Sequence, residues 1–231
     1  MSPKQLKERV EDYQDELLER LLSIEVDAHW FRRVFHTYAS SFLAFYLLPN
    51  APWIDVVKLM VPVAILVLVG IIECRRLGGV LDRQYFFGLR TYEHHRPASY
   101  FYFGAGLIIL LLAFPQQIAV PCILCACFVD PAIGEFRYRL KKKTAYLLGF
   151  FLSAGFFLVT WFHAQPWVIL CVCLIGAAGT VLGERVKIRW LDDDLLIQLV
   201  PALLLFVFWQ GLSVFHVNIL PPALLHPLGG F

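Results

Sequence analysis

Residues 56–72 read VVKLMVPVAILVLVGII, an apolar stretch with a single charged residue, Lys58. The pair Arg75-Arg76 follows shortly after it. A transmembrane helix needs roughly 20 mostly apolar residues, which this stretch reaches with its flanking residues. It therefore predicts a helix that crosses a bilayer and ends at a basic interface.

Further apolar segments of this kind lie on both sides of that stretch. They are residues 34–48, 98–114, 118–129, 144–162, 167–182 and 195–217. Hydrophobic residues make up 59% of the 231-residue chain and charged residues only 16%, whereas a soluble domain is usually nearer half apolar. We therefore predict an all-α, polytopic membrane protein with about seven transmembrane helices.

The basic residues predict the orientation of these helices. All Lys and Arg residues except Lys58 fall before the first segment or in alternate connections, and the acidic residues except Asp55 lie on the same side. Basic residues are retained on the cytoplasmic side, so the N-terminus is predicted to be cytoplasmic. The polar chemistry is expected on that side too. The net charge of +2 gives no reason to expect a nucleic-acid partner.

The chain begins with a charged segment instead of a signal peptide. Apolar residues recur at helical spacing from Leu6 to Leu22, opposite acidic residues such as Glu11 and Asp15. We predict an amphipathic cytoplasmic or interfacial helix over residues 1–28, followed by one transmembrane catalytic domain over residues 29–231. 

The cysteines other than Cys74 lie inside apolar runs. Cys122, Cys125 and Cys127 are closely spaced, but a zinc site needs a fourth ligand and no candidate is nearby in the sequence. Cysteine also packs well as a small hydrophobic residue. Packing between helices is therefore the interpretation we adopt.

The strongest local cluster is Asp130-Pro131-Ala132-Ile133-Gly134-Glu135, followed by Lys141-Lys142-Lys143-Thr144. A carboxylate for Mg²⁺ and lysines at a helix start for phosphates are what nucleotide chemistry requires. The alternative is a helix that ends at Asp130, followed by an ordinary cytoplasmic basic cluster. Spacing alone favours neither interpretation.

A second acidic cluster, Asp192-Asp193-Asp194, lies before the last apolar segment, with Glu184 upstream. Three adjacent carboxylates repel one another, and a divalent cation would relieve that repulsion. An N-cap with a solvated acidic turn is the alternative, and it is favoured when the motif is taken alone.

Two more clusters lie at predicted helix starts. Arg32 and Arg33 precede His36 by about one helical turn, so their side chains can share a face and bind phosphate. A histidine here also suits a hydrogen bond between helices. Glu93 lies in a polar segment before residue 98, flanked by aromatic residues that suit the membrane interface or a lipid groove.

Taken in order, these four clusters resemble the motifs of the polyprenol kinase family. That family includes dolichol kinase, phytol kinase and the CTP-dependent diacylglycerol kinases, and it is related to CDP-diacylglycerol synthases. The matching residues are Arg32-Arg33 with His36, Arg90 and Glu93 with residues 99–104, Asp130-Pro131-Ala132 with Gly134-Glu135 and Lys142-Lys143-Thr144, and Glu184 with Asp192-Asp193.

The resemblance implies transfer of the γ-phosphate of CTP to the hydroxyl of a lipid alcohol, in a bacterial inner membrane or an endoplasmic reticulum or plastid membrane. The roles it implies are Mg²⁺ binding by Asp130, Asp192 and Asp193, nucleotide binding by Lys142, Lys143, Thr144 and Gly134, assistance by Arg32, Arg33 and His36, and orientation or deprotonation of the hydroxyl by Glu93 or Glu135. The active site is expected to face the cytoplasm.

Two other functions stay open. A cytidylyltransferase would convert a lipid phosphate to a CDP-lipid and release pyrophosphate. A non-catalytic scaffold or transporter is favoured by Tyr146 and Leu147, which stand where the family usually has Glu-Gly. Transport is disfavoured because charged residues are absent from the middle of the predicted segments.

Overall fold

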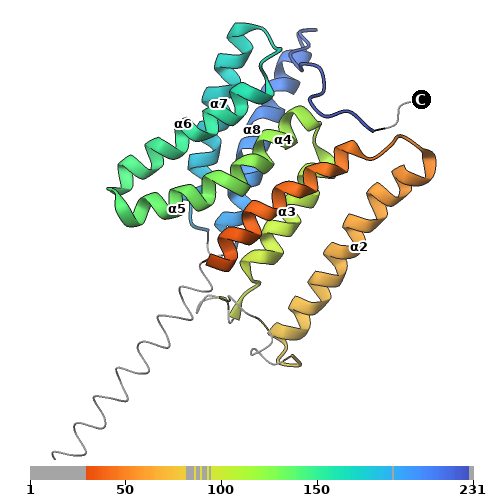
Figure 1. The fold of residues 1–231 in the computed structure, drawn as a ribbon, viewed down its shortest axis with the longest axis vertical. Coiled ribbons are helices and arrows are strands. Elements are labelled where there is room, and N and C mark those ends of the chain that lie inside the picture. The colour runs from red at the N-terminus through yellow and green to blue at the C-terminus, as the bar shows by residue number, and fades with distance from the viewer. Residues whose placement is uncertain are drawn as a thin grey trace, which may run out of the picture.

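The computed structural model describes residues 30–81, 86, 89, 93, 95–188 and 190–228. Within these residues the regular structure is helical, apart from one isolated bridge between Ile188 and Leu191 (Figure 1). The amphipathic helix predicted over residues 1–28 lies outside the described residues, and so does most of the predicted loop around Arg90.

The chain folds into a series of apolar helices joined by short connections. Residues 30–39 form a helix that continues into η1, and the further elements are η1 (Ser40–Leu47), α2 (Pro52–Leu77), α3 (Ser99–Ala113), α4 (Gln116–Leu124), η4 (Cys125–Val129), α5 (Asp130–Arg139), α6 (Lys142–Thr160), α7 (Pro166–Arg185) and α8 (Asp193–Ser213).

Five of these helices are long and apolar enough to cross a membrane. They are Pro52–Leu77, Gln116–Arg139, Lys142–Thr160, Pro166–Arg185 and Asp193–Ser213. The apolar helix Ser99–Ala113 is shorter, with 15 residues. Five apolar helices of this length make the chain a multi-pass helical membrane protein, which agrees with the predicted fold class.

The helix at Asp130 differs from the sequence expectation. We expected the fourth apolar segment to end at Asp130, but α4, η4 and α5 form one continuous helical rod over Gln116–Arg139. The π-turn of η4 explains the continuity: the N–H of Asp130 bonds to the carbonyl of Cys125, five residues earlier. Pro131 lacks an N–H and its ring would crowd the preceding turn of an ordinary α-helix, and the wider π-turn relieves that conflict.

Helices α7 and α8 pack closely because α7 presents glycines to α8. A Cβ on Gly179 would lie 2.7 Å from Cα of Pro201, and one on Gly183 would lie 2.5 Å from the carbonyl oxygen of Leu196. Small residues let the backbones of membrane helices approach in this way. The close packing brings Glu184, at the end of α7, to the start of α8.

The rod of α4, η4 and α5 runs through the centre of the molecule. In its most apolar window, 61% of the residues are buried. Cys122, Cys125 and Cys127 lie in this core and are fully buried, as the packing interpretation predicted.

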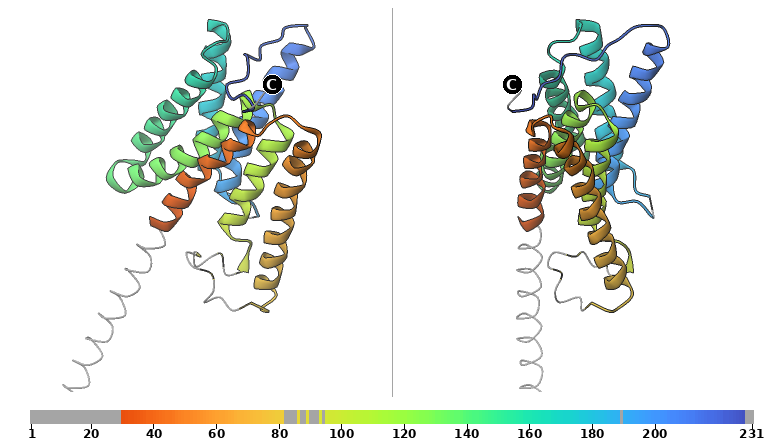
Figure 2. Two further views of the ribbon diagram at one scale, coloured as in Figure 1. Left: turned by 45° about the vertical axis from the view of Figure 1, so that its right-hand side comes forward. Right: turned by 90° about the vertical axis from the view of Figure 1, so that its right-hand side faces the viewer.

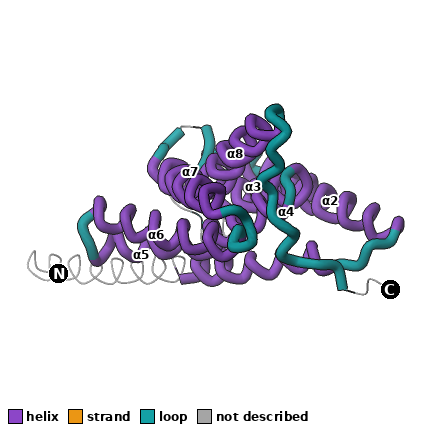
Figure 3. Tube along the Cα trace, turned by 90° about the horizontal axis from the view of Figure 1, so that it is seen from above, coloured by secondary structure: helices purple, strands orange, loops and turns teal. Residues whose placement is uncertain are grey.

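Helix α2 lies at one edge of the molecule, and the α5–α6 hairpin lies at the other (Figures 2 and 3). Only 6% of the α2 window is buried, and among the larger elements α2 packs against α3. The exposed apolar surface of α2 is therefore available for contact with other apolar groups, such as lipid chains.

Candidate functional site

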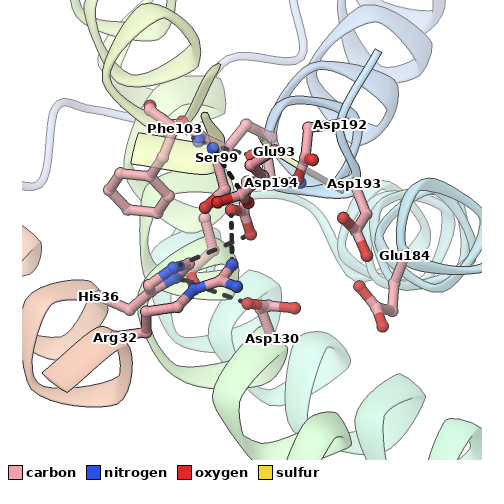
Figure 4. A network of polar contacts seen from close by, with 12 residues as sticks. Arg32, His36, Glu93, Ser99, Phe103, Asp130, Glu184, Asp192, Asp193 and Asp194 are labelled. Atoms are coloured by element: carbon pink, nitrogen blue, oxygen red, sulfur yellow. Dashed lines mark hydrogen bonds and ion pairs between the residues drawn. The ribbon is translucent and has the colours of Figure 1, made fainter. Parts of the chain in front are cut away.

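Polar side chains from four separate parts of the chain converge near the start of α5 and α8 (Figure 4). They come from the helix over residues 30–39, the junction of η4 and α5, the end of α7 and the start of α8, and they are Arg32, His36, Asp130, Glu184, Asp192, Asp193 and Asp194. Three of the four clusters recognised in the sequence therefore meet in space.

His36, Asp130 and Asp194 form the centre of this site. Nδ1 of His36 lies 3.5 Å from Oδ2 of Asp130, and its Nε2 lies 3.9 Å from Oδ1 of Asp194. One ligand atom from each of the three lies within 4.8 Å of the others, as a shared metal ion would require. Arg32, one turn before His36 on the same helix, also reaches this group, with Nη2 3.1 Å from Oδ2 of Asp194.

Asp192 offers a ligand atom close to those of Asp193 and Asp194, and it also caps a helix. Its carboxylate accepts from the N–H of Asp194 and caps α8, so the N-cap interpretation is correct, but the expected solvation is not, because Asp192 and Asp194 are buried. Arg96 donates to its other oxygen at 3.0 Å. Burial, a hydrogen bond with Asp193 and the charges of Asp194 and Asp193 raise the pKa of Asp192 to about 7. The surroundings therefore disfavour the ionised form of Asp192.

Glu184 adds a further buried carboxylate opposite Asp193 (Figure 4). Its Oε1 lies 2.9 Å from Nη2 of Arg137, and its side chain is fully buried. Asp193 in turn contacts the ammonium of Lys187. Carboxylates and cations thus alternate through the site, as in a site that holds both a metal ion and phosphate groups.

A polar pocket of about 350 Å³ opens beside these side chains. It is lined by residues from the helix over 30–39, the start of α5 and the start of α8: Arg32, Arg33, His36, Asp130, Pro131, Gly134, Arg137, Tyr138 and Asp193. The pocket offers two carboxylates and three guanidinium groups on one surface. Carboxylate oxygens are what Mg²⁺ binds in proteins, so Asp130 and the adjacent Asp194, with His36 beside them, fit a divalent cation.

A second, apolar groove of about 710 Å³ lies between the helix over 30–47, α2 and α3. Its walls are mostly aliphatic and aromatic side chains such as Phe42, Ile65 and Leu107. Its polar lining includes Glu93 and Ser99, together with Arg32 and His36, which also line the polar pocket. The apolar groove and the polar pocket therefore meet at Arg32 and His36.

Glu93 and Glu135, which were predicted to orient or deprotonate the hydroxyl, lie in different surroundings. Glu93 is 1% exposed, its Oε1 accepts from the N–H of Ser99 at 3.4 Å, and it lines the groove. Glu135 lies at the surface and pairs with Arg33 at 2.5 Å and with Arg139 at 2.7 Å. Glu93 is thus placed to meet a group in the groove, whereas Glu135 holds a pocket arginine.

The predicted phosphate-binding lysines lie apart from this site. Lys142, Lys143 and Thr144 are exposed at the start of α6, and none of them lines the polar pocket. The 10 residues of α5 separate them from Asp130, about 15 Å along the helix axis. The pocket's own cations are Arg32, Arg33 and Arg137.

Sequence reasoning missed Arg137 and Arg96 as members of the site, and it named Asp194 in the acidic cluster without giving it a metal-binding role. Arg137 follows Asp130 by seven residues, so the two share a helix face only if the helix continues past Asp130. Because the sequence analysis ended the helix at Asp130, it did not place Arg137 on the same helix face as Asp130. Arg96 carries no local signal, because it reaches Asp192 only through the packing of α3 against α8.

No family model matches the chain, and no curated protein or solved structure matches it significantly.

Proposed function

We propose that this protein is a CTP-dependent kinase that phosphorylates the hydroxyl of a membrane lipid alcohol, of the polyprenol, dolichol, phytol or diacylglycerol type. The resemblance to the polyprenol kinase family is part of this proposal. So is a topology of seven transmembrane helices, with the N-terminus and the polar pocket on the cytoplasmic side.

The observation that carries the proposal is the meeting of the polar pocket and the apolar groove at Arg32 and His36. A lipid kinase must hold a hydrocarbon chain and a nucleotide phosphate at the same time. The groove offers an apolar surface for the chain, and the pocket offers carboxylates and arginines for a metal-bound polyphosphate. The reacting hydroxyl would lie where the two join.

In this reaction the lipid hydroxyl oxygen attacks the γ-phosphorus of CTP, the bond from that phosphorus to the β-phosphate oxygen breaks, and CDP leaves. Asp130 and Asp194, with His36 beside them, would hold Mg²⁺, which would neutralise charge on the phosphates. Arg32, Arg33 and Arg137 hold the phosphate oxygens. Glu93, buried in the groove wall, takes the hydroxyl proton.

The experiment is phosphorylation by the purified protein in lipid vesicles. Labelled CTP and Mg²⁺ are supplied with a panel of polyprenol, dolichol, phytol and diacylglycerol, and lipid phosphate and CDP are measured. We expect lipid phosphate to form with CTP in preference to ATP. Equal or better use of ATP, or no lipid phosphate with any alcohol, would refute the proposal.

A cytidylyltransferase is the second candidate, because Arg32 at the junction can also bind the phosphate of a lipid phosphate. The two reactions differ in their products. Release of pyrophosphate and formation of a CDP-lipid from a lipid phosphate would replace the kinase with this function. Failure of the protein to bind CTP would instead favour a scaffold on the same fold.

A further inference from the structure

At the C-terminal end of α2 two charged side chains are buried, whereas charged residues are usually exposed. The buried residues of this helix are Ile54, Glu73 and Arg76, while most of its aliphatic side chains are exposed. Glu73 and Arg76 are 3% and 4% exposed. Burying a charged pair is costly unless every polar atom finds a partner, so we asked what this pair holds.

The two side chains bind each other first. Nε of Arg76 lies 3.1 Å from each carboxylate oxygen of Glu73, and its Nη2 lies 2.6 Å from Oε2. The remaining donor capacity of the guanidinium reaches the backbone of another segment, with bonds to the carbonyls of Glu93 at 3.0 Å and Arg96 at 2.8 Å.

The Glu73 carboxylate holds the same segment from its other side. Its Oε2 accepts from the N–H of Ala98 at 3.3 Å, and its Oε1 accepts from the hydroxyl of Tyr100. The pair therefore binds the backbone at residues 93, 96 and 98 and a side chain in the first turn of α3. All the contacts converge on the short connection that leads into α3.

This connection carries two groups of the candidate site. The carboxylate of Glu93 lines the apolar groove, and the guanidinium of Arg96 donates to Asp192 at the start of α8. Asp192 caps the turn that contains Asp193 and Asp194. Hydrogen bonds thus connect Arg76 of α2 through Arg96 to Asp192, and from Asp192 to the backbone of Asp194.

We propose that Glu73 and Arg76 are a positioning pair, which holds residues 93–98 so that Glu93 faces the groove and Arg96 supports Asp192. Neither residue lines the polar pocket, so neither touches CTP. The inference rests on the proposed function for its catalytic consequence, but the placement of the connection by the pair can be measured without any activity.

The test compares Arg76→Gln with Arg75→Gln, which removes the same charge from an exposed neighbour. Amide hydrogen exchange is measured across residues 93–101 of the full-length protein, along with kcat and KM for CTP. In Arg76→Gln we expect faster exchange across this connection, and kcat lowered more than about tenfold because a buried charge loses its partner. KM for CTP should stay close to that of the wild type, and Arg75→Gln should match the wild type in every measurement.

Tyr100→Phe tests the same idea with a change that removes one hydroxyl and leaves the charged pair intact. It should raise exchange in the same peptides and lower kcat by a smaller factor. This variant decides the question if Arg76→Gln does not fold.

The outcomes separate this inference from the proposed function. Unchanged exchange across residues 93–101, or faster exchange with unchanged kcat, would overturn the positioning role. A wild-type protein that phosphorylates no lipid would refute the kinase proposal, and the exchange comparison would still decide whether the pair holds the connection.

Discussion

The polar pocket and the apolar groove share Arg32 and His36, yet they are built from different kinds of sequence. The pocket consists of charged residues that interrupt an apolar chain, so each of them costs free energy unless it is used. The groove consists of ordinary aliphatic and aromatic residues that would suit any membrane helix. The difference teaches that an apolar groove can lie beside a visible polar site and carry no motif of its own.

The groove exists because α2 stands away from the rod of α4, η4 and α5. Among the five described helices long enough to cross a membrane, the rod is the most covered and α2 the least, with 61% and 6% of their windows buried. If α2 packed fully against the core, no space would remain between α2 and the helix over residues 30–47. The peripheral place of α2 thus leaves an apolar surface next to the pocket.

Asp130→Asn should have the largest effect. If Asp130 holds Mg²⁺, the change removes a charged ligand while keeping size and polarity, and losing several kcal/mol of transition-state stabilisation lowers kcat by about 10³-fold or more. Lipid phosphorylation is the measurement, with yield and thermal stability as controls. Near-normal activity in a well-folded variant would remove Asp130 and the metal from the pocket.

Gly104→Phe should impair the groove and spare the pocket. Gly104 lines the groove in α3, and a Cβ there meets no atom within 4 Å, so the ring has space to enter it. We expect kcat/KM for the lipid alcohol to fall about tenfold or more, as steric changes in apolar pockets do. The KM for CTP should not change.

The matched control is Gly155→Phe, at a helical glycine of α6 that also has open space and lines neither cavity. It should behave like the wild type. Equal losses in the two variants, or a Gly104→Phe protein with normal lipid kinetics, would show that the chain of the substrate lies elsewhere.

A smaller effect is expected on KM for CTP, which should depend on the arginines of the pocket and not on the lysines of α6. Arg33→Gln removes a pocket cation and should raise KM for CTP about tenfold, the value of one charge-assisted hydrogen bond. The double variant Lys142→Gln/Lys143→Gln changes exposed residues at the far end of α5, and we expect its KM within about twofold of the wild type. The reverse order would place the nucleotide at the start of α6.

The smallest functional effect is expected from single cysteines that report the side of the membrane. Cysteines at Asn50 and Gln165 should react with impermeant thiol reagents from outside, and one at Arg139 only from the cytoplasm, with phosphorylation unchanged. The result places the pocket relative to the bilayer. Reaction of the Arg139 cysteine from outside would contradict the predicted topology.

The sequence by itself determined the membrane class, because apolar stretches near 20 residues long have few alternatives to a bilayer helix. It also picked out Arg32, His36, Asp130 and Asp193, because polar residues beside apolar helices are conspicuous. It placed the end of the helix wrongly at Asp130, since the π-turn that accommodates Pro131 has no sequence signal of its own.

Only the tertiary structure decided which polar residues meet. Packing of α7 against α8 brings Glu184 to Asp193, and packing of α3 against α8 brings Arg96 to Asp192. The sequence predicted that Lys142 and Lys143 bind the nucleotide and that Arg32 and Arg33 assist, but the length of α5 places the lysines away from the pocket. The physical reason is that the charge and hydropathy of a segment depend only on its consecutive residues. A site depends on contacts between helices that are distant in the sequence, and packing determines those contacts.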